Sequence, residues 1–219
     1  EFRKFVHCEF LIRNIIIKLP NWSHTIICGN LNYEFMKKIA DSISPNIKIV
    51  KLDIDNLNTA EYSRLLMTKE FWNNFNGEKL LLYQEDSYMF HNRIDKFLKY
   101  DYVGAPWPID QDEHINQKEY GVGNGGFSLR TKSKMIEVIE KINWEKDLTL
   151  GSKLKEYMKN TNNYIIPEDV YFSKSLLEKG IGKVAPRIIA LNFSQETQKS
   201  PNPLGGHNFY LADNYTLPN

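Results

Sequence analysis

Apolar residues in the first third of the chain alternate between short continuous runs and runs at helical spacing. A run of four to six apolar residues bounded by Gly, Pro or Asn is typical of a buried strand, and apolar residues three and four apart indicate a helix. The predicted strands are Thr25 to Cys28, Ile47 to Leu52 and Lys79 to Tyr83, and the predicted helices are Asn32 to Ile43 and Thr59 to Phe75. This alternation predicts an α/β fold in which helices cover a sheet.

The second half of the chain is less regular. Its predicted elements are a short strand at Phe127 to Arg130, a helix from Ser133 to Ile142 and a helix from Val170 to Glu178 that begins at Pro167-Glu168-Asp169. Polar residues predict a mobile loop at Asp110 to Lys118 and another loop at Asn160 to Asn163. Pro and acidic residues are favoured in the first turn of a helix, which supports the start assigned to the last helix.

Composition limits the classes of function. The 219 residues are 42% hydrophobic and 25% charged, which is ordinary for a globular protein with a substantial core. A formal net charge of +1 provides no basic field for phosphate backbones, so we expect no nucleic-acid partner. The longest apolar run, Ile15 to Ile17, is far shorter than the ~20 residues that cross a bilayer, so we expect no transmembrane segment.

Two cysteines, Cys8 and Cys28, exclude a secreted disulfide framework and favour a reducing compartment, so we expect a cytoplasmic location. The chain begins Glu-Phe-Arg without a methionine, and we expect additional domains in a longer protein.

Two oxygen-bearing side chains follow the third predicted strand. Gln84-x-Asp86 stands at its carboxyl end, where open α/β sheets bind ligands. A carboxylate there is a candidate ligand for Mg²⁺ or Mn²⁺, although a solvated acidic turn is the simpler interpretation of one acid taken alone. His207, after Gly205-Gly206, is a second candidate metal ligand, and an ordinary loop histidine is its simpler interpretation.

The segment Gly121 to Gly126 contains a literal G-x-G-x-x-G. A dinucleotide-binding fingerprint must follow a strand and open a helix, whereas this segment follows polar residues and enters the predicted strand at Phe127. Asn124, Gly125 and Gly126 are better explained as a tight turn, which either lets a ligand approach the backbone or is purely structural.

The pair Glu168-Asp169 opens a predicted helix. Acids in a first turn complement the helix dipole, which accounts for one of them. The dipole favours the ionised carboxylate and desolvation opposes it, so a general base at this position is chemically plausible.

Five segments taken in order resemble one family. They are Leu81 to Ser87 (LLYQEDS), Tyr102 to Trp107 (YVGAPW), Gly123 to Arg130 (GNGGFSLR), Pro167 to Phe172 (PEDVYF), and Phe193 to Glu196 (FSQE) with Gly206-His207. This order is similar to a glycosyltransferase family that is catalogued as a domain of unknown function and has a GT-A type fold. The resemblance covers roughly residues 80 to 210.

The resemblance implies a single GT-A-like domain over residues 1–219, with a central, mostly parallel sheet. About residues 1–90 would form the nucleotide-binding half, and about 91–219 the acceptor-side and catalytic half. It implies transfer of a sugar from a nucleotide sugar, UDP-linked, to a glycan or protein acceptor hydroxyl, with inversion of configuration.

The resemblance also implies roles for individual residues. Asp86 and His207 would hold Mn²⁺ or Mg²⁺, and Gln84 stands where these enzymes commonly have another acid. Asp169 would be the catalytic base, with Glu168 as its partner toward the acceptor or as a structural residue. The donor would contact Gln84, Asp86, Asn124, Gly125 and Gly126, and Trp107 would stack on a sugar or on the acceptor. We expect the base of the donor toward Gly29-Asn30, because this pair, like Asp86, follows an early strand of the predicted sheet.

Two other functions compete with an active transferase. A module that binds a nucleotide sugar or glycan without turnover is one of them, and the amide at Gln84 favours it. A metal-dependent phosphoesterase is the other, but it needs more clustered Asp and His residues than this sequence provides.

Overall fold

The computed structural model describes residues 2–108, 122–161 and 164–208. Its helices are α1 (Cys8–Lys18), α2 (Tyr33–Ile43), α3 (Thr59–Leu66), α4 (Lys69–Asn73), the 3₁₀ helix η1 (Ile94–Phe97), α5 (Lys132–Lys141), α6 (Trp144–Asp147), α7 (Ser152–Asn160), α8 (Glu168–Glu178) and α9 (Arg187–Phe193). Its strands are β1 (Thr25–Cys28), β2 (Lys48–Lys51), β3 (Lys79–Tyr83), β4 (Ser87–Met89), β5 (Tyr102–Pro106), β6 (Val122–Thr131), β7 (Ser194–Gln195) and β8 (Gly205–His207).

The strands form three small sheets. β1 and β2 are parallel, the order β3-β6-β5 is antiparallel, and the order β4-β8-β7 contains one antiparallel and one parallel pair. The fold is therefore mixed α/β, as predicted. The central, mostly parallel sheet expected from the resemblance is wrong for the described residues, because β3 and β5 both run opposite to β6.

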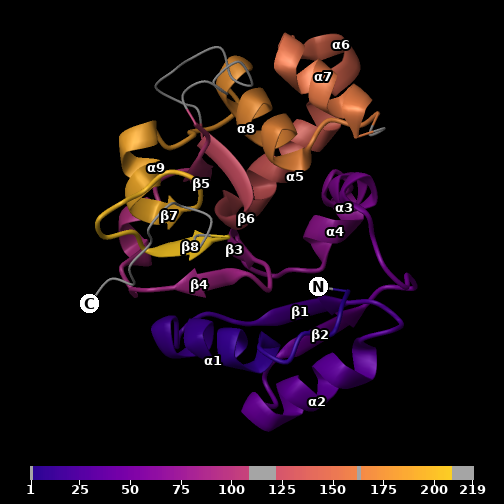
Figure 1. Cartoon of the computed structure of the whole chain (residues 1–219), viewed down its shortest axis with the longest axis vertical. Coiled ribbons are helices and arrows are strands. Elements are labelled where there is room, and N and C mark those ends of the chain that lie inside the picture. The colour runs from indigo at the N-terminus through magenta and orange to yellow at the C-terminus, as the bar shows by residue number, and fades with distance from the viewer. Residues whose placement is uncertain (1, 109–121, 162–163, 209–219) are drawn as a thin grey trace.

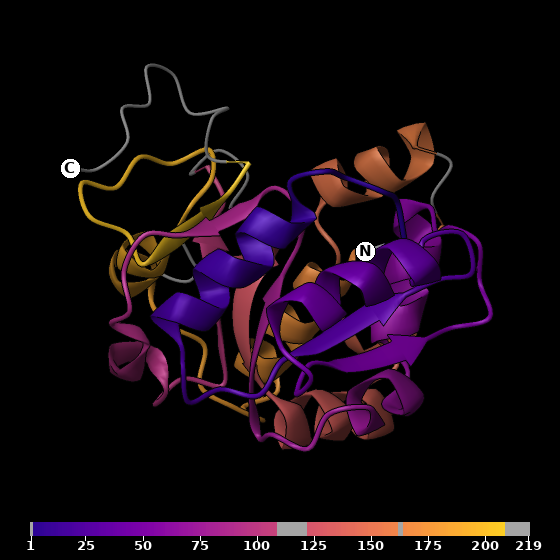
Figure 2. The ribbon, with the colours of Figure 1, turned by 90° about the horizontal axis from the view of Figure 1, so that it is seen from below.

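Figure 1 shows β1, β2, α1 and α2 at one end of the molecule and α5 to α8 at the other, with the remaining sheets between them. A small apolar cluster joins α1, β1 and α2, which lie beside one another in Figure 2, and a larger cluster fills the rest of the protein. α1 belongs to both clusters, through Ile12 on one side and Ile15 on the other. The division near residue 90 stays a prediction.

Local capping explains where one predicted helix breaks. The single helix expected over residues 59–75 is two helices, because Thr68 adopts an extended backbone and its hydroxyl accepts a hydrogen bond from Phe71 N. α3 begins with a capping box, in which Asn58 and Glu61 each accept a backbone N–H of the other.

Within the glycine segment, Val122 to Gly126 form part of a strand and not a tight turn. β6 runs for ten residues, and its first half, where Asn124 and Gly125 lie, pairs with β5 through an irregular register. α5 begins at Lys132 behind its N-cap Thr131, one residue before the predicted start at Ser133. The predicted loop at 110–118 lies outside the described residues, as do Asn162 and Asn163. No helix in the described part of the chain is long and apolar enough to cross a membrane.

Candidate functional site

Two short segments that are distant in sequence meet beside the end of β3. β4 pairs with β8 so that Ser87 lies opposite His207, which brings the residues after β3 next to the imidazole. His207 Nε2 lies 3.1 Å from Gln84 Oε1 and 3.1 Å from Asp86 Oδ1. The structure thus brings together Gln84, Asp86 and His207, three residues singled out by the sequence.

A second acidic group completes this cluster on the other side of the imidazole. Glu196 Oε1 lies 3.4 Å from His207 Nδ1 and accepts a hydrogen bond of 2.8 Å from Asn124 Nδ2. Burial alone would lower the pKa of His207, but Asp86 and Glu196 outweigh it and raise the pKa to about 9. The imidazole is therefore a cation at neutral pH in this arrangement.

Two buried atoms of the cluster lack a hydrogen-bond partner among the described residues. They are Asp86 Oδ1, whose approach to His207 does not have hydrogen-bond geometry, and His207 Nδ1. Unsatisfied buried polar atoms are costly and often mark ligand sites. A carboxylate oxygen and an imidazole nitrogen fit a divalent cation that completes its shell with water and phosphate. No group of three or more His, Cys, Asp or Glu in the described chain is arranged to hold a metal ion.

Two glycines let side chains lie against β6. A Cβ on Gly126 would stand 2.2 Å from the His207 ring, and one on Gly125 would stand 2.4 Å from Glu168 Oε1. Any side chain at these two positions would collide with the candidate site. The glycines expected to admit a sugar therefore already make room for His207 and Glu168 in this structure.

Glu168 forms a buried ion pair. Its two carboxylate oxygens accept hydrogen bonds of 2.5 and 3.0 Å from Arg130 Nη1 and Nη2. The Arg130 guanidinium also lies near the rings of Tyr102, Phe172 and Trp72, at 4.8, 5.8 and 5.9 Å from their centroids. Of the two predicted roles for Glu168, this geometry fits the structural partner.

Asp169 lies beside that ion pair in the first turn of α8. Its Oδ1 accepts a hydrogen bond of 2.8 Å from Val170 N. Desolvation, followed by the charge of Glu168, raises the pKa of Asp169 to about 7, and Glu196 contributes in the same direction. The expected pull of the helix dipole toward the ionised form is thus outweighed by burial. A carboxyl group with this pKa exchanges protons near neutral pH.

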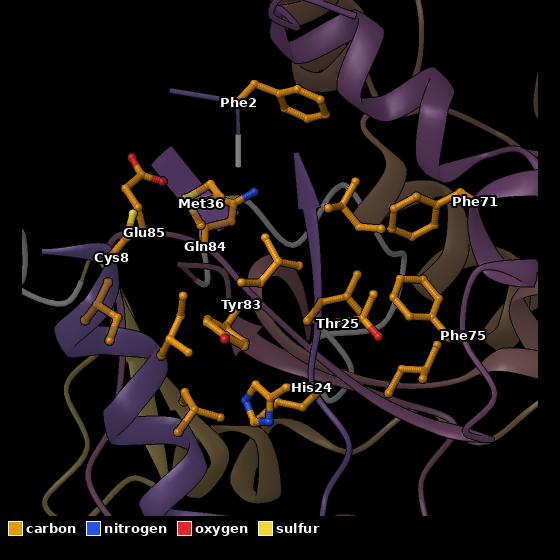
Figure 3. A pocket seen from close by; sticks show the side chains of 18 of the residues that line it. Phe2, Cys8, His24, Thr25, Met36, Phe71, Phe75, Tyr83, Gln84 and Glu85 are labelled. Atoms are coloured by element: carbon orange, nitrogen blue, oxygen red, sulfur yellow. The ribbon is translucent and has the colours of Figure 1, made fainter. Parts of the chain in front are cut away.

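A cavity of about 630 Å³ borders the site on the side of Gln84. It lies between α1 and β1 on one side and α3, α4 and β3 on the other. Figure 3 shows Gln84 and Glu85 on one side of it and Phe71 and Phe75 on the opposite side. Tyr62 also lines this cavity, as Gln84 does. Gln84 therefore connects the cavity with the cluster around His207.

Two of the sequence-predicted site residues are elsewhere. Asn30 Nδ2 donates to Asp53 Oδ1 at 3.0 Å and Asp55 Oδ1 at 3.2 Å. A Cβ on Gly29 would meet Ile54 O at 2.3 Å, so the backbone of Gly29 is already covered. Among the described residues, no contact of Gly29 or Asn30 with the Asp86 cluster is found.

The stacking role predicted for Trp107 does not fit its position in the structure. Its side chain is 9% exposed, belongs to the larger core and lies against Gly123. Arg187 Nη2 donates to its backbone oxygen at 2.5 Å. An indole packed in this way leaves little surface for a sugar ring, so the stacking prediction is wrong in this structure.

Sequence reasoning missed Arg130, Glu196 and Tyr62 as site residues. Arg130 and Glu196 each end a segment that carried the resemblance, which was a usable signal. Tyr62 lay within an apolar helix face and gave no signal, because only tertiary packing brings it to the same cavity as Gln84.

The fold and site together define a mixed α/β protein with a buried acid, histidine and amide cluster. Residues 46–207 match the family described as "Protein of unknown function (DUF5672)", and the chain belongs to this family. A search of curated proteins finds no match. The crystal structure of HddC from Yersinia pseudotuberculosis is similar at a TM-score of 0.40 with 15% sequence identity, over 64% of this chain and 69% of that one. A likeness at this level says nothing about function.

Proposed function

We propose that the protein is a glycosyltransferase that moves a sugar from a nucleotide sugar, UDP-linked, to an acceptor hydroxyl with inversion. The observation that carries the proposal is the half-buried Asp169, whose pKa of about 7 suits a general base, next to the cluster of Asp86, His207 and Glu196. The family resemblance of the ordered motifs supports the same reaction.

Asp169 would accept the proton of the acceptor hydroxyl as that oxygen attacks the anomeric carbon. Glu168 is less suited to this task, because Arg130 occupies both of its carboxylate oxygens. A base with a pKa near the working pH combines a useful ionised fraction with adequate proton affinity. This favours Asp169 over Glu168 as the base.

The donor would lie along the residues that follow β3. Asp86 and His207 would hold a divalent cation, which, when bound, neutralises the charge of the leaving nucleoside diphosphate. His207 must give up a proton to act as a ligand, since it is a cation in the present arrangement. Asn124 and Glu196, already hydrogen-bonded to each other, would accept or donate to hydroxyl groups of the sugar.

A second function is a binding module that holds a nucleotide sugar or glycan without turnover. The observation that favours it is the position of Gln84, whose amide oxygen lies 3.1 Å from His207 Nε2 and brings no negative charge to the cation site. Weak cation binding would then limit catalysis and leave only recognition.

Calorimetry with UDP-glucose, UDP-galactose and UDP-N-acetylglucosamine, with and without Mn²⁺, separates these functions when it is followed by an assay for released UDP. An active transferase binds at least one donor and releases UDP in the presence of an acceptor. Asp86→Ala should abolish the Mn²⁺-dependent part of donor binding. Binding without any release of UDP would support the module, and no binding of any of these donors would refute both the transferase and a module that binds a UDP-sugar.

A further inference from the structure

Three aromatic rings pack together between the start of α1 and β4, and two of them are stacked. The Phe10 ring lies nearly parallel to that of Tyr88, with centroids 5.8 Å apart and planes at 17°, and Tyr88 in turn packs on Phe90 at 5.4 Å. Phe10 is nevertheless 59% exposed. The result is a flat apolar ring that is held in place from below and open to solvent above. Figure 1 shows α1 beside β4, where this stack forms.

The stack belongs to a groove with acidic groups along one side. This aromatic groove encloses about 460 Å³ and is lined by Phe5, His7, Phe10, Leu11, Glu85, Asp86, Ser87 and Tyr88. Glu85 is fixed by an ion pair with Arg3 at 2.9 Å. Asp86 Oδ1 is buried and has no hydrogen-bond partner among the described residues. An exposed ring therefore stands beside two carboxylates with fixed positions.

We propose that the aromatic groove binds a saccharide, as the part of the acceptor that lies away from the reacting hydroxyl. This inference rests on the proposed function and adds the acceptor class to it. A pyranose has an apolar face of C–H groups, which packs on an aromatic ring, and a rim of hydroxyls, which donate to carboxylates. The groove offers both kinds of partner side by side.

Other occupants fit these residues less well. An aliphatic chain would cover Phe10 but would place an apolar surface against the carboxylates of Glu85 and Asp86, and an anionic ligand would meet their charges. A protein partner could also cover Phe10, and the experiment below distinguishes it.

The position of Asp86 connects the groove with the rest of the site. Asp86 lines the groove, and its side chain also lies 3.1 Å from His207. A saccharide in the groove would therefore lie beside the proposed donor site. Phe10 would then provide the stacking surface that the buried Trp107 does not.

Saturation-transfer NMR tests the groove without any donor or turnover. The probes are lactose, maltose, cellobiose and N,N′-diacetylchitobiose at millimolar concentration, with the intact protein and with Phe10→Ala. The matched control is Ile17→Ala, since Ile17 is 74% exposed on the same helix but does not line the groove. Phe10 is exposed, so the variant should keep the thermal midpoint of the parent protein.

We expect at least one disaccharide to receive saturation, with its affinity lowered about tenfold by Phe10→Ala and unchanged by Ile17→Ala. Absence of saturation for all four probes would overturn the proposal that the aromatic groove binds a saccharide. An affinity of Phe10→Ala equal to that of the parent protein would also overturn it. A change of oligomeric state in Phe10→Ala, seen by light scattering, together with no saccharide signal would assign the groove to a protein interface and also overturn it. Donor binding measured separately by calorimetry shows whether the proposed function fails as well.

Discussion

Arg130 and Glu168 are joined by two hydrogen bonds although both side chains are buried, at 0% and 5% exposure. The pair links β6 to the first turn of α8. Arg130 Nε also donates to Ser128 Oγ at 2.9 Å, and that hydroxyl donates to Gly125 O at 2.9 Å. The glycine segment and the helix that carries Asp169 are thus held in one arrangement by a single guanidinium.

Removal of one partner of this pair should destabilise the protein strongly. Arg130→Met leaves the Glu168 carboxylate buried without its counter-ion, and such changes cost about 3–5 kcal/mol. The free energy of unfolding in urea measures this loss. The double variant Arg130→Met/Glu168→Leu should recover most of it, because it leaves no unpaired charge. A double variant as unstable as Arg130→Met would show that the pair itself is not the cause.

Asp169 should make stability depend on pH in a defined window. The pKa of this group is about 7 in the folded protein and 3.8 in its ordinary state. Between these values the folded protein binds more protons than the unfolded chain, so this group lowers stability as pH rises from about 4 to about 7.

Asp169→Asn should therefore raise the thermal midpoint at pH 8 by at least about 2 °C and by much less near pH 4. Melting curves of both proteins at the two pH values measure this difference between the thermal midpoints. Both proteins contain His207, so its contribution to the pH dependence cancels in the comparison. A lower midpoint for Asp169→Asn at pH 8 would contradict the raised pKa.

The transfer reaction should follow the ionisation of the same carboxyl group. If Asp169 is the base, kcat should rise with pH through about 7 and level off above it, since only the ionised form accepts a proton. Asp169→Asn should lower kcat by about 10²–10⁴-fold and leave donor affinity within a few fold. Unimpaired transfer by a folded Asp169→Asn protein would exclude Asp169 and direct attention to Glu168 or to a retaining mechanism.

Gly126 should tolerate no side chain. Its Cβ would stand 2.2 Å from the His207 ring, so Gly126→Ala must displace the imidazole from Asp86 and Gln84. We expect a loss of about 1–3 kcal/mol of stability and weaker Mn²⁺-dependent donor binding. Gly77→Ala is the matched control, because the nearest atom to its Cβ is 3.5 Å away. Equal behaviour of the two variants in calorimetry would refute the close packing of His207.

The short-range features of this protein follow from its sequence. β1 and β3 have the predicted bounds, because a run of apolar residues closed by Gly-Asn or by polar residues is decided within the segment itself. The start of α8 behind Pro167, with two acids in its first turn, is likewise a local matter. Gln84, Asp86 and Asp169 could be chosen as candidates for the same reason, since each adjoins the end of a predicted strand or helix, and His207 was chosen for the two glycines before it and for the family resemblance.

Tertiary packing decided what those residues do. Asp169 and Glu168 are adjacent in the chain, yet their environments differ. Arg130 of β6 forms an ion pair with Glu168, whereas Asp169 is desolvated and has no such partner among the described residues. The charge of His207 depends on Asp86 and Glu196, which reach it from different segments. Trp107 was misjudged because exposure is a property of the packed molecule. Burial and charge proximity act through space, and sequence spacing does not contain them.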